Sequence, residues 1–463
     1  MAQQQLIFNS DLIRRYDTAG PRYTSYPTAV QFHSDFTAET YRHYAKNSNQ
    51  LTPPLSLYFH IPFCDTLCFY CACNKIATKD RSKVAPYLSH LSRELELQSE
   101  LFDAQRMVTQ LHWGGGTPTF MSHQEMETLM NVTARHFRLL NDDTGEYSIE
   151  IDPREADLNT IRLLRALGFN RLSLGVQDFN PDVQKAVNRL QTEKQTFDVL
   201  NAAREQGFKS ISIDLIYGLP LQTVDSFSDT VKRILTANPD RISVFNYAHL
   251  PHLFKPQRRI NENDLPSASQ KLLILQNTIE LLTAAGYVYI GMDHFAKPDD
   301  ELAIAQRNGT LYRNFQGYAT HADCDLIGLG ITSIGKVGHS YSQNYKTLEE
   351  YYAAIDAGQL AIFRGIGLTN EDVLRREVIT QLICHFELEV RKIEQSFNID
   401  FQTHFAQEWH ALASLQADGL VDVTPEKITV LPAGRLLVRH VCMVFDAYLP
   451  QHLAEKQRFS KVI

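Results

Sequence analysis

The sequence lacks the features that mark membrane-spanning, secreted and nucleic-acid-binding proteins. No window of about 18 apolar residues occurs, so we expect no membrane-spanning helix. The chain does not open on a basic segment followed by an apolar one, so we expect no signal peptide and a cytoplasmic location. Five successive like charges are also absent, and the formal net charge of −8 argues against a nucleic-acid partner.

Cysteine is scarce, and its distribution is uneven. Only seven of the 463 residues are cysteine, an odd number that, without a secretory signal, does not resemble a disulfide framework. Cys324, Cys384 and Cys442 are isolated, and we interpret them as small buried apolar residues. The other four cysteines cluster at positions 64, 68, 71 and 73, which points to metal or redox chemistry.

Short apolar or alternating runs recur through the first half of the chain, separated by stretches with helical spacing. One such stretch repeats leucine or isoleucine every three residues from Leu158 to Leu167, and Gly168 ends it. Strands that alternate with helices form a parallel sheet, which right-handed crossovers wind in one direction. We predict an α/β fold with a partial (β/α)6 barrel; a doubly wound open sheet is the alternative. The predicted strands span residues 55–61, 108–113, 147–152, 171–176, 210–217 and 241–247.

We divide the chain into three parts. Residues 1–52 are polar and irregular and form an N-terminal extension over the active site, and residues 53–361 hold the barrel and its extension. Residues 362–463 form a smaller, mostly helical C-terminal domain that includes a hairpin between residues 421 and 430. A DNA-binding winged helix is the alternative for this domain. Because no basic stripe accompanies it, we prefer a packing or substrate-covering role.

Cys64, Cys68 and Cys71 form a C-x3-C-x2-C motif directly after the first predicted strand. Soft thiolates select iron–sulfur clusters, zinc or Cu(I), and three cysteines leave one iron of a cubane open for catalysis. A zinc site with Cys73 or His60 as the fourth ligand remains open at this point. The carboxyl end of a strand is where barrels and α/β sheets keep their active sites, which favours a catalytic centre.

Several polar residues are predicted to lie near the same edge of the sheet. Tyr58 and His60 share one face of the first strand, as site residues or as half-buried aromatics. The glycines at 114–116 follow the second strand and can bring backbone close to a ligand, or form a plain turn. Glu150 and Asp152 end the third predicted strand, Gln177 follows the fourth and Asp214 lies in the fifth; they suit ribose hydroxyls or cations, or are satisfied surface or hinge residues. Arg189 could pair with a carboxylate.

A strand that ends in this cysteine motif, with the aromatic Tyr70 before the last cysteine, resembles the radical S-adenosylmethionine (SAM) superfamily. The resemblance implies one [4Fe-4S] cluster on Cys64, Cys68 and Cys71. In that superfamily the open iron is chelated by the amino and carboxylate groups of SAM. An electron from the cluster then splits SAM and yields a 5′-deoxyadenosyl radical.

Further motifs narrow the resemblance to the oxygen-independent coproporphyrinogen III oxidase family. They extend over nearly the whole chain and are least clear in the last hundred residues. The motifs are GPRYTSYPT (20–28), YFHIPFCDTLCFYCACNK (58–75), HWGGGTPT (112–119), IEIDPRE (149–155), SLGVQDF (173–179), IDLIYGLP (213–220), YAHLPHLFKPQRR (247–259), GMDHFAKPDDEL (291–302) and NFQGY (314–318).

This resemblance implies two SAM molecules in the barrel. Cys73 matches a fourth cysteine that is not a cluster ligand in the family, and we take it, with His60, as a candidate catalytic residue. The residues that match contacts to the first SAM are Tyr58, Gly115, Glu150 and Ile334. Those that match contacts to the second are Tyr70, Gly116, Thr117, Gln177, Arg189, Asp214 and Ala248.

The implied reaction converts two propionates of coproporphyrinogen III to vinyl groups and gives protoporphyrinogen IX, in anaerobic heme biosynthesis. It needs an electron donor and an electron acceptor, which the sequence does not identify, and we expect a monomer. The tetrapyrrole substrate carries four carboxylates, so we expect cations to bind it. The candidates are Arg22, Lys255, Arg258, Arg259 and Arg313.

Two other functions compete with this interpretation. A heme chaperone of the same superfamily shares the cysteine loop. The Cys73-Asn74-Lys75 continuation and the segment at 20–28 are both present and favour the enzyme. A zinc-stabilised binding protein is the alternative from another class.

Overall fold

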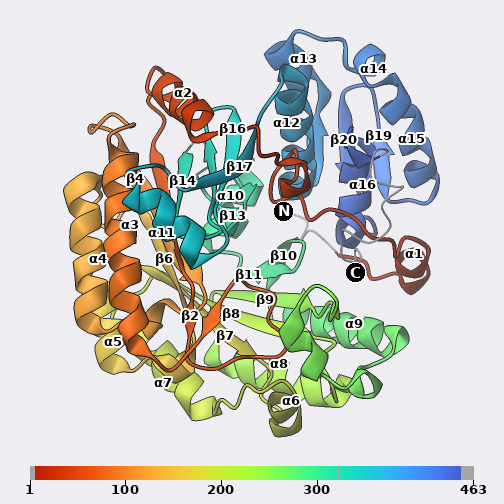
Figure 1. Ribbon diagram of the computed structural model, residues 1–463. Coiled ribbons are helices and arrows are strands. Elements are labelled where there is room, and N and C mark those ends of the chain that lie inside the picture. Colours follow the sequence, from red (N-terminus) through yellow and green to blue (C-terminus); the bar gives the residue numbers. More distant parts are fainter. Residues whose placement is uncertain (1–5, 322–323, 450–463) are drawn as a thin grey trace. The chain divides into compact units, whose positions relative to one another are not determined.

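The computed structural model describes residues 6–321 and 324–449. The chain divides into two compact units (Figure 1). The larger unit comprises residues 32–281 and 323–367, and the smaller unit combines Met1–Gln31, Leu282–Ala322 and Leu368–Ile463. No helix in the described part is long and apolar enough to cross a membrane.

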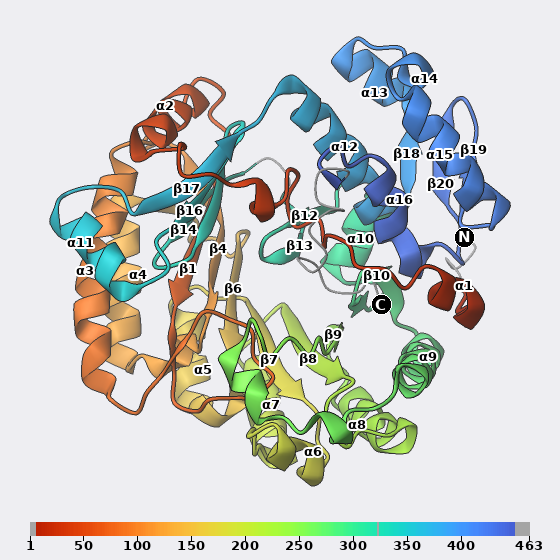
Figure 2. The same ribbon diagram turned by 45° about the vertical axis from the view of Figure 1, so that its right-hand side comes forward.

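Parallel strands form the centre of the larger unit. Their spatial order follows the chain, as Figure 2 shows. A doubly wound sheet would reverse direction at a switch point, so that alternative is wrong. The described strands do not close on themselves, and the unit is a partial barrel. In order they are β1 (Leu55–Ile61), β4 (Met107–Gly115), β6 (Glu146–Ile151), β7 (Arg171–Gln177), β8 (Ser210–Tyr217) and β9 (Arg241–Asn246).

The sheet continues beyond β1 in the other direction, which the sequence pattern did not indicate. β14 (Asp325–Leu329) pairs with β1 in parallel, although more than 260 residues separate them in the chain (325 against 61). β15 (Ile334–Val337), β16 (Ser340–Asn344) and β17 (Ile362–Gly367) then follow in antiparallel order. β1 therefore lies inside the sheet, and the residue after it emerges between two neighbouring strand ends.

Helices cover the outer side of this sheet (Figure 1). Side-chain caps define where several of them begin: Ser122, Thr192 and Thr223 each form a capping box. Leu158, expected on the buried face of its helix, is 40% exposed because it is the first residue after the Asp157 cap. The covering helices are α3 (Val84–Ser99), α4 (His123–His136), α5 (Leu158–Ala166), α7 (Glu193–Glu205) and α8 (Val224–Ala237), with α6 (Pro181–Ala186) and α9 (Ala268–Ala284) after β7 and β9.

Residues expected to be irregular at the N-terminus contain two helices. α1 (Ser10–Arg15) belongs to the smaller unit, where Tyr16 donates to Asp418. α2 (Ala38–Ser48) belongs to the larger unit, where Tyr41 donates to Gln98 of α3 at 2.9 Å. Both helices are short, and both are held by contacts with residues distant in the chain.

The smaller unit is mostly helical, as expected for its C-terminal part (Figure 2). The predicted hairpin is present as β19 (Val421–Val423) and β20 (Lys427–Val430), joined by β18 (Glu387–Glu389). Residues 401–417 form two helices that are separated at Phe405. The helices are α12 (Asn370–His385), α13 (Val390–Phe397), α14 (Phe401–His404), α15 (Ala406–Ala417) and α16 (Val438–Val444), with β10 (Val288–Gly291), β11 (His294–Ala296), α10 (Glu301–Asn308), β12 (Tyr312–Asn314) and β13 (Gly317–Ala319) from the middle of the chain.

Candidate active site

The cysteine loop leaves the carboxyl end of β1 and is closed at its base by backbone pairing. β2 (Phe63–Cys64) pairs with β3 (Ile76–Ala77). The Ile76 N–H donates to the Pro62 carbonyl at 2.7 Å, and the Thr78 N–H donates to the Cys64 carbonyl at 2.9 Å. The intervening residues therefore form a loop whose two ends lie side by side.

The tip of the loop is held by the segment after β7. The Phe69 N–H donates to the Val187 carbonyl and the Asn188 side chain donates to the Leu67 carbonyl, both at 2.9 Å. Phe69 and Tyr70 also pack against a buried apolar cluster that includes Val187. The chain itself therefore fixes both ends of the loop.

The three motif thiols have different surroundings. Thr117 Oγ1 lies 3.5 Å from Cys64 Sγ, and burial raises the pKa of Cys64 to about 11. A hydrogen bond with Cys73, helped by the charge of Lys75, lowers the pKa of Cys71 to about 5. In the described part of the chain, no three His, Cys, Asp or Glu side chains form a group that could hold a single metal ion. The donor set of three soft thiols with cations beside them fits a polynuclear iron–sulfur cluster.

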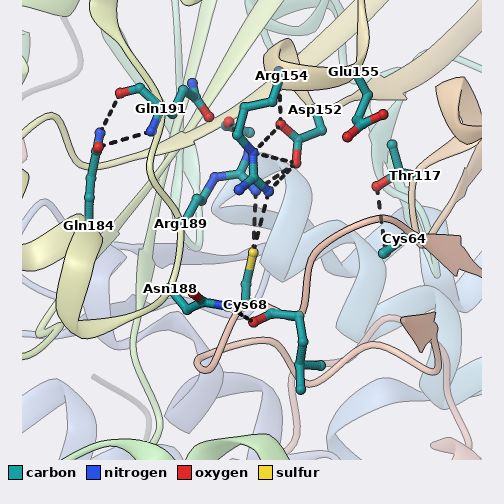
Figure 3. A network of polar contacts seen from close by, with 12 residues as sticks. Cys64, Cys68, Thr117, Asp152, Arg154, Glu155, Gln184, Asn188, Arg189 and Gln191 are labelled. Atoms are coloured by element: carbon teal, nitrogen blue, oxygen red, sulfur yellow. Dashed lines mark hydrogen bonds and ion pairs between the residues drawn. The ribbon is translucent and has the colours of Figure 1, made fainter. Parts of the chain in front are cut away.

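Cys68 lies beside two guanidinium groups (Figure 3). Arg189 Nη1 lies 3.6 Å and Arg154 Nη2 lies 3.7 Å from Cys68 Sγ. Asp152 joins the two arginines, because its Oδ2 accepts from Arg189 at 3.0 Å and from Arg154 at 2.6 Å. Burial would raise the pKa of Asp152, but the two guanidinium groups outweigh it and lower that pKa. Two positive charges thus face one sulfur.

A second group of side chains lies on β1, β4 and β6. The Tyr58 hydroxyl lies 3.1 Å from His60 Nδ1, and the Tyr58 ring stacks on His112. His112 lies 2.6 Å from Ser148 Oγ and 3.4 Å from Glu150 Oε1. This hydrogen-bonded row confirms that Tyr58 and His60 share one face of β1.

The glycine turn at 114–116 is required by close packing. A Cβ on Gly115, whose φ is +110°, would lie 2.6 Å from the His60 ring, and one on Gly116 would lie 2.7 Å from the backbone of Pro62 and Phe63. The N–H groups of Gly115, Gly116 and Thr117 donate to Glu150, Ile61 and Phe63 respectively. These three N–H groups are therefore used within the chain, and Thr117 Oγ1 and the backbone carbonyls are the polar groups that this turn can offer to a ligand.

The remaining predicted residues line the ends of β7, β8, β9 and β15. Gln177 has a φ of 70°, and its buried Oε1 has no hydrogen-bond partner among the residues described. Asp214 accepts from Ser173 at 2.9 Å, and burial raises its pKa to about 6. Gln257 links two further predicted residues, Tyr70 and Ala248. Its side-chain amide donates to their carbonyls, at 3.1 Å and 3.2 Å respectively.

The structure thus brings several of the predicted residues into two groups. One contains Tyr58, His60, Gly115 and Glu150, and the other contains Cys68, Asp152 and Arg189. Ile334 lies against Gly328, the residue paired with Tyr58, and reaches the first group only through that contact.

Sequence reasoning missed three residues that organise these groups: His112, Arg154 and Gln257. His112 and Arg154 each stand at or next to a predicted strand end inside a motif already singled out, so alternation and strand position could have identified them. Gln257 lies in a short 3-10 helix (Lys255–Arg259) inside the motif at 247–259, away from the ends of the predicted strands.

A parallel singly wound sheet with a three-cysteine loop at the carboxyl end of its first strand defines the class. Residues 58–234 match the Radical SAM superfamily, and residues 368–437 match the HemN C-terminal domain. The chain is therefore a radical SAM protein.

Similar proteins show to which family of radical SAM proteins the chain belongs. The chain is 57% identical to an oxygen-independent coproporphyrinogen III oxidase of Pseudomonas aeruginosa, over 98% of this chain and 99% of the relative. It is 52% identical to that of Escherichia coli over the full length of both. A solved structure of the Escherichia coli coproporphyrinogen III oxidase, described as a radical SAM enzyme, superposes with a TM-score of 0.91 at 51% identity, over 96% of this chain and all of that one. The chain belongs to the oxygen-independent coproporphyrinogen III oxidase family.

Proposed function

We propose that this chain oxidatively decarboxylates two propionate side chains of coproporphyrinogen III to vinyl groups, giving protoporphyrinogen IX. One observation carries the proposal. The three-thiol loop, with two arginines at Cys68, stands at the strand end where this class keeps its active site, in a chain similar over its whole length to relatives of this name.

We propose that Cys64, Cys68 and Cys71 would hold one [4Fe-4S] cluster, which would act on SAM. When bound, the cluster supplies the electron that splits SAM into methionine and a 5′-deoxyadenosyl radical. The chain's own residues position the sulfurs, balance their charge and limit access of water. Burial of Cys64 and Cys68 supports this role.

The two SAM sites remain proposals for individual residues. We assign Tyr58, Gly115, Glu150 and Ile334 to the first site, supported by the row of contacts along β1, β4 and β6. The open acceptor of Gln177 and the buried carboxyl group of Asp214 support the second site. Its members are Tyr70, Gly116, Thr117, Gln177, Arg189, Asp214 and Ala248.

We also propose His60 and Cys73 as catalytic residues. Burial lowers the pKa of His60, so its ring is neutral near pH 7. Its Nε2 lies 2.9 Å from the Asn74 carbonyl, so Nε2 carries the hydrogen and Nδ1 accepts from Tyr58. Cys73 is exposed and hydrogen-bonds to Cys71, which suits a residue near the cluster that does not bind it.

Each propionate side chain must lose a hydrogen atom, its carboxylate and one electron to become a vinyl group. Each propionate loses one hydrogen atom from the carbon next to the ring. The resulting radical releases its carboxylate as carbon dioxide and gives one electron to an acceptor, so that a double bond remains. Two turns of this sequence consume two SAM molecules. A reductant for the cluster and an electron acceptor are the partners the proposal requires.

The placement of the chain's parts is likewise proposed. We infer that residues 1–52 cover the active site and that the C-terminal domain, residues 362–463, has a packing or substrate-covering role, with residues 53–361 as the catalytic part. We propose a monomer in the cytoplasm.

Anaerobic reconstitution tests the function. The reconstituted protein is incubated with SAM, dithionite and coproporphyrinogen III, and we expect 5′-deoxyadenosine and carbon dioxide to form together. Tight heme binding without release of carbon dioxide would favour the chaperone instead. A colourless protein that holds one zinc and no iron would favour the zinc-stabilised binding protein.

A further inference from the structure

The smaller unit contains a group of cations that the sequence distributes over three distant segments. Arg22 forms an ion pair with Asp293. Arg439, at 2% exposure, donates to the carbonyls of Gly20 and Pro21. Arg313 lies on β12, and its charge helps to lower the pKa of Asp293. Three arginines from the N-terminal segment, the β12–β13 hairpin and α16 therefore gather at one place within this unit.

Arg313 is the unusual member of the group. Its side chain lies over the Tyr318 ring at 4.8 Å, and the residue is only 6% exposed. Within residues 6–321 and 324–449, its Nε and Nη1 atoms have no hydrogen-bond partner. Buried guanidinium groups are ordinarily paired, because an unpaired donor loses its hydrogen bonds to water without replacement. Arg313 thus keeps two donors in place and unused.

The charges around Arg313 favour an anion. Burial is the main reason that the pKa of Arg439 falls to about 10, and the nearby charges of Arg22 and Arg313 lower it further. Asp293 is the carboxylate that these arginines share, and its ion pair with Arg22 is accessible, since Arg22 is 37% and Asp293 18% exposed in their side chains. His294 lies beside Asp293 and stacks edge-on against Tyr318.

The other candidate cations differ from Arg313. Lys255, Arg258 and Arg259 are exposed, and they belong to the larger unit. Arg258 already donates to the Pro251 carbonyl, and Arg259 lies over the Phe69 ring at 5.3 Å. Exposed cations attract any anion weakly, whereas a buried and positioned guanidinium recognises one carboxylate.

We propose that Arg313, assisted by Arg22, is the recognition site for a carboxylate of the tetrapyrrole substrate. This inference rests on the proposed function and assigns a binding role to the β12–β13 hairpin, distinct from the cysteine loop and the SAM residues. The carboxylate accepts from one of the open donors of Arg313, Nε or Nη1, and Asp293 holds Arg22 beside it.

The test measures equilibrium binding by the anaerobic holoenzyme. The probes are coproporphyrin III, which carries four free carboxylates, and its tetramethyl ester, which has the same ring without charge. We expect R313M to weaken coproporphyrin III binding by at least about tenfold. We expect ester binding, cluster absorbance and substrate-free cleavage of SAM to stay within about twofold of the wild type. R307M, on the exposed face of α10 in the same unit, is the matched control and leaves all four readouts unchanged.

The proposal would be overturned if R313M bound coproporphyrin III as tightly as the wild type does, or if it lost affinity for coproporphyrin III and for the tetramethyl ester equally. R313K serves as a second variant if R313M folds poorly, because lysine keeps the charge but cannot present the planar donors. It is expected to bind coproporphyrin III with intermediate affinity, and wild-type affinity in R313K would also overturn the proposal. If the wild type binds coproporphyrin III but releases no carbon dioxide from coproporphyrinogen III, the proposed function fails and the carboxylate site stands.

Discussion

Cys68 differs from the other loop thiols because two guanidinium groups donate to its sulfur. Hydrogen bonds to the sulfurs and nearby charge set the reduction potential of an iron–sulfur cluster. Reduction adds negative charge, so Arg154 and Arg189 favour the reduced state. Arg154 is the better probe of this effect, since we assign no SAM contact to it.

We predict that Arg154→Met lowers the midpoint potential of the reconstituted cluster. A shift of about 60 mV for one electron corresponds to a tenfold change in the reduction equilibrium, and we expect a shift of this order. An anaerobic titration followed by electron paramagnetic resonance measures it. Arg162→Met, on the exposed face of α5, is the control. An unchanged or higher potential in Arg154→Met would rule out the electrostatic role.

Gly115 is constrained in both space and backbone conformation. We predict that Gly115→Ala destabilises the protein by about 2 kcal/mol or more, since its Cβ would lie 2.6 Å from the His60 ring at a φ of +110°. Gly207→Ala is the control: its φ is +74° and a Cβ there meets nothing within 4 Å, so we expect about 1 kcal/mol. Denaturant unfolding measures the stability of both variants. Equal losses of unfolding free energy would mean that the contact with His60 does not contribute to the effect of Gly115→Ala.

The sequence predicted many residues of the site but not their connections. Tyr58, Glu150 and Gln177 were recognisable because strand ends and motifs mark them. Arg154 escaped notice because a charged residue after a strand is ordinarily a solvated one. Its position at Cys68 depends on the pairing of β6 with β7, which brings Asp152 and Arg189 together.

At the scale of elements, α3 holds the ends of two strands. Glu94 accepts from the Gly330 N–H at 2.7 Å, from Asn344 at 2.6 Å and from Tyr351 at 2.7 Å. Tyr87 lies about two helical turns before Glu94 in the same helix, and it donates to the His60 carbonyl at 2.6 Å. This helix therefore fixes the exit of β1 and the loop after β14 together.

Glu94 should also make stability depend on pH. Burial raises its pKa from 4.5 to about 7. The folded state then binds more protons than the unfolded state between these values, so this contribution is fully present below about pH 4.5 and is lost as pH rises through 7. We predict a loss of up to about 3 kcal/mol between pH 4.5 and 8.

Glu94→Gln tests this dependence through chemical denaturation at both pH values. In this variant, the free energy of unfolding should no longer show the part of its pH dependence that comes from titration of Glu94. It should also be less stable at each pH by about 1 to 3 kcal/mol, because the amide nitrogen faces donors. Glu100→Gln, at the exposed end of α3, should keep the wild-type slope. The same slope in Glu94→Gln and the wild type would contradict the assignment.

The elements themselves were largely predictable. Local alternation sets the bounds of a strand, and predicted residues 55–61 and 210–217 coincide with β1 and β8. Pairing across long distances is not local, and so the position of β14 beside β1 could not be predicted. The helix at α2 was missed because its polar sequence becomes helical through tertiary contacts, such as that of Tyr41 with Gln98.

At the scale of the molecule, the smaller unit is assembled from three separate stretches of the chain. Arg439 of α16 donates to Gly20 and Pro21, and Tyr23 donates to Asp446 at 2.9 Å. The N-terminal segment is therefore held by residues near the other end of the chain. No local pattern could predict this arrangement.

We predict that Arg439→Met destabilises the smaller unit by about 2 to 4 kcal/mol, because two buried carbonyls lose a charged donor. Amide hydrogen exchange should accelerate at residues 10–25 and remain unchanged in β1 and β4. Arg391→Met, on the exposed face of α13, should leave both regions unchanged. Protection of residues 10–25 in Arg439→Met would contradict the proposed attachment.

The cysteine loop is held at its base by β2 and β3 and at its tip by Val187 and Asn188. These contacts involve only the polypeptide, so we expect the loop to keep its course without iron. Oxygen destroys exposed iron–sulfur clusters, and many proteins that lose one also lose local structure. Here we expect the emptied protein to keep its loop and to accept iron and sulfide again when air is withdrawn, without a new round of synthesis.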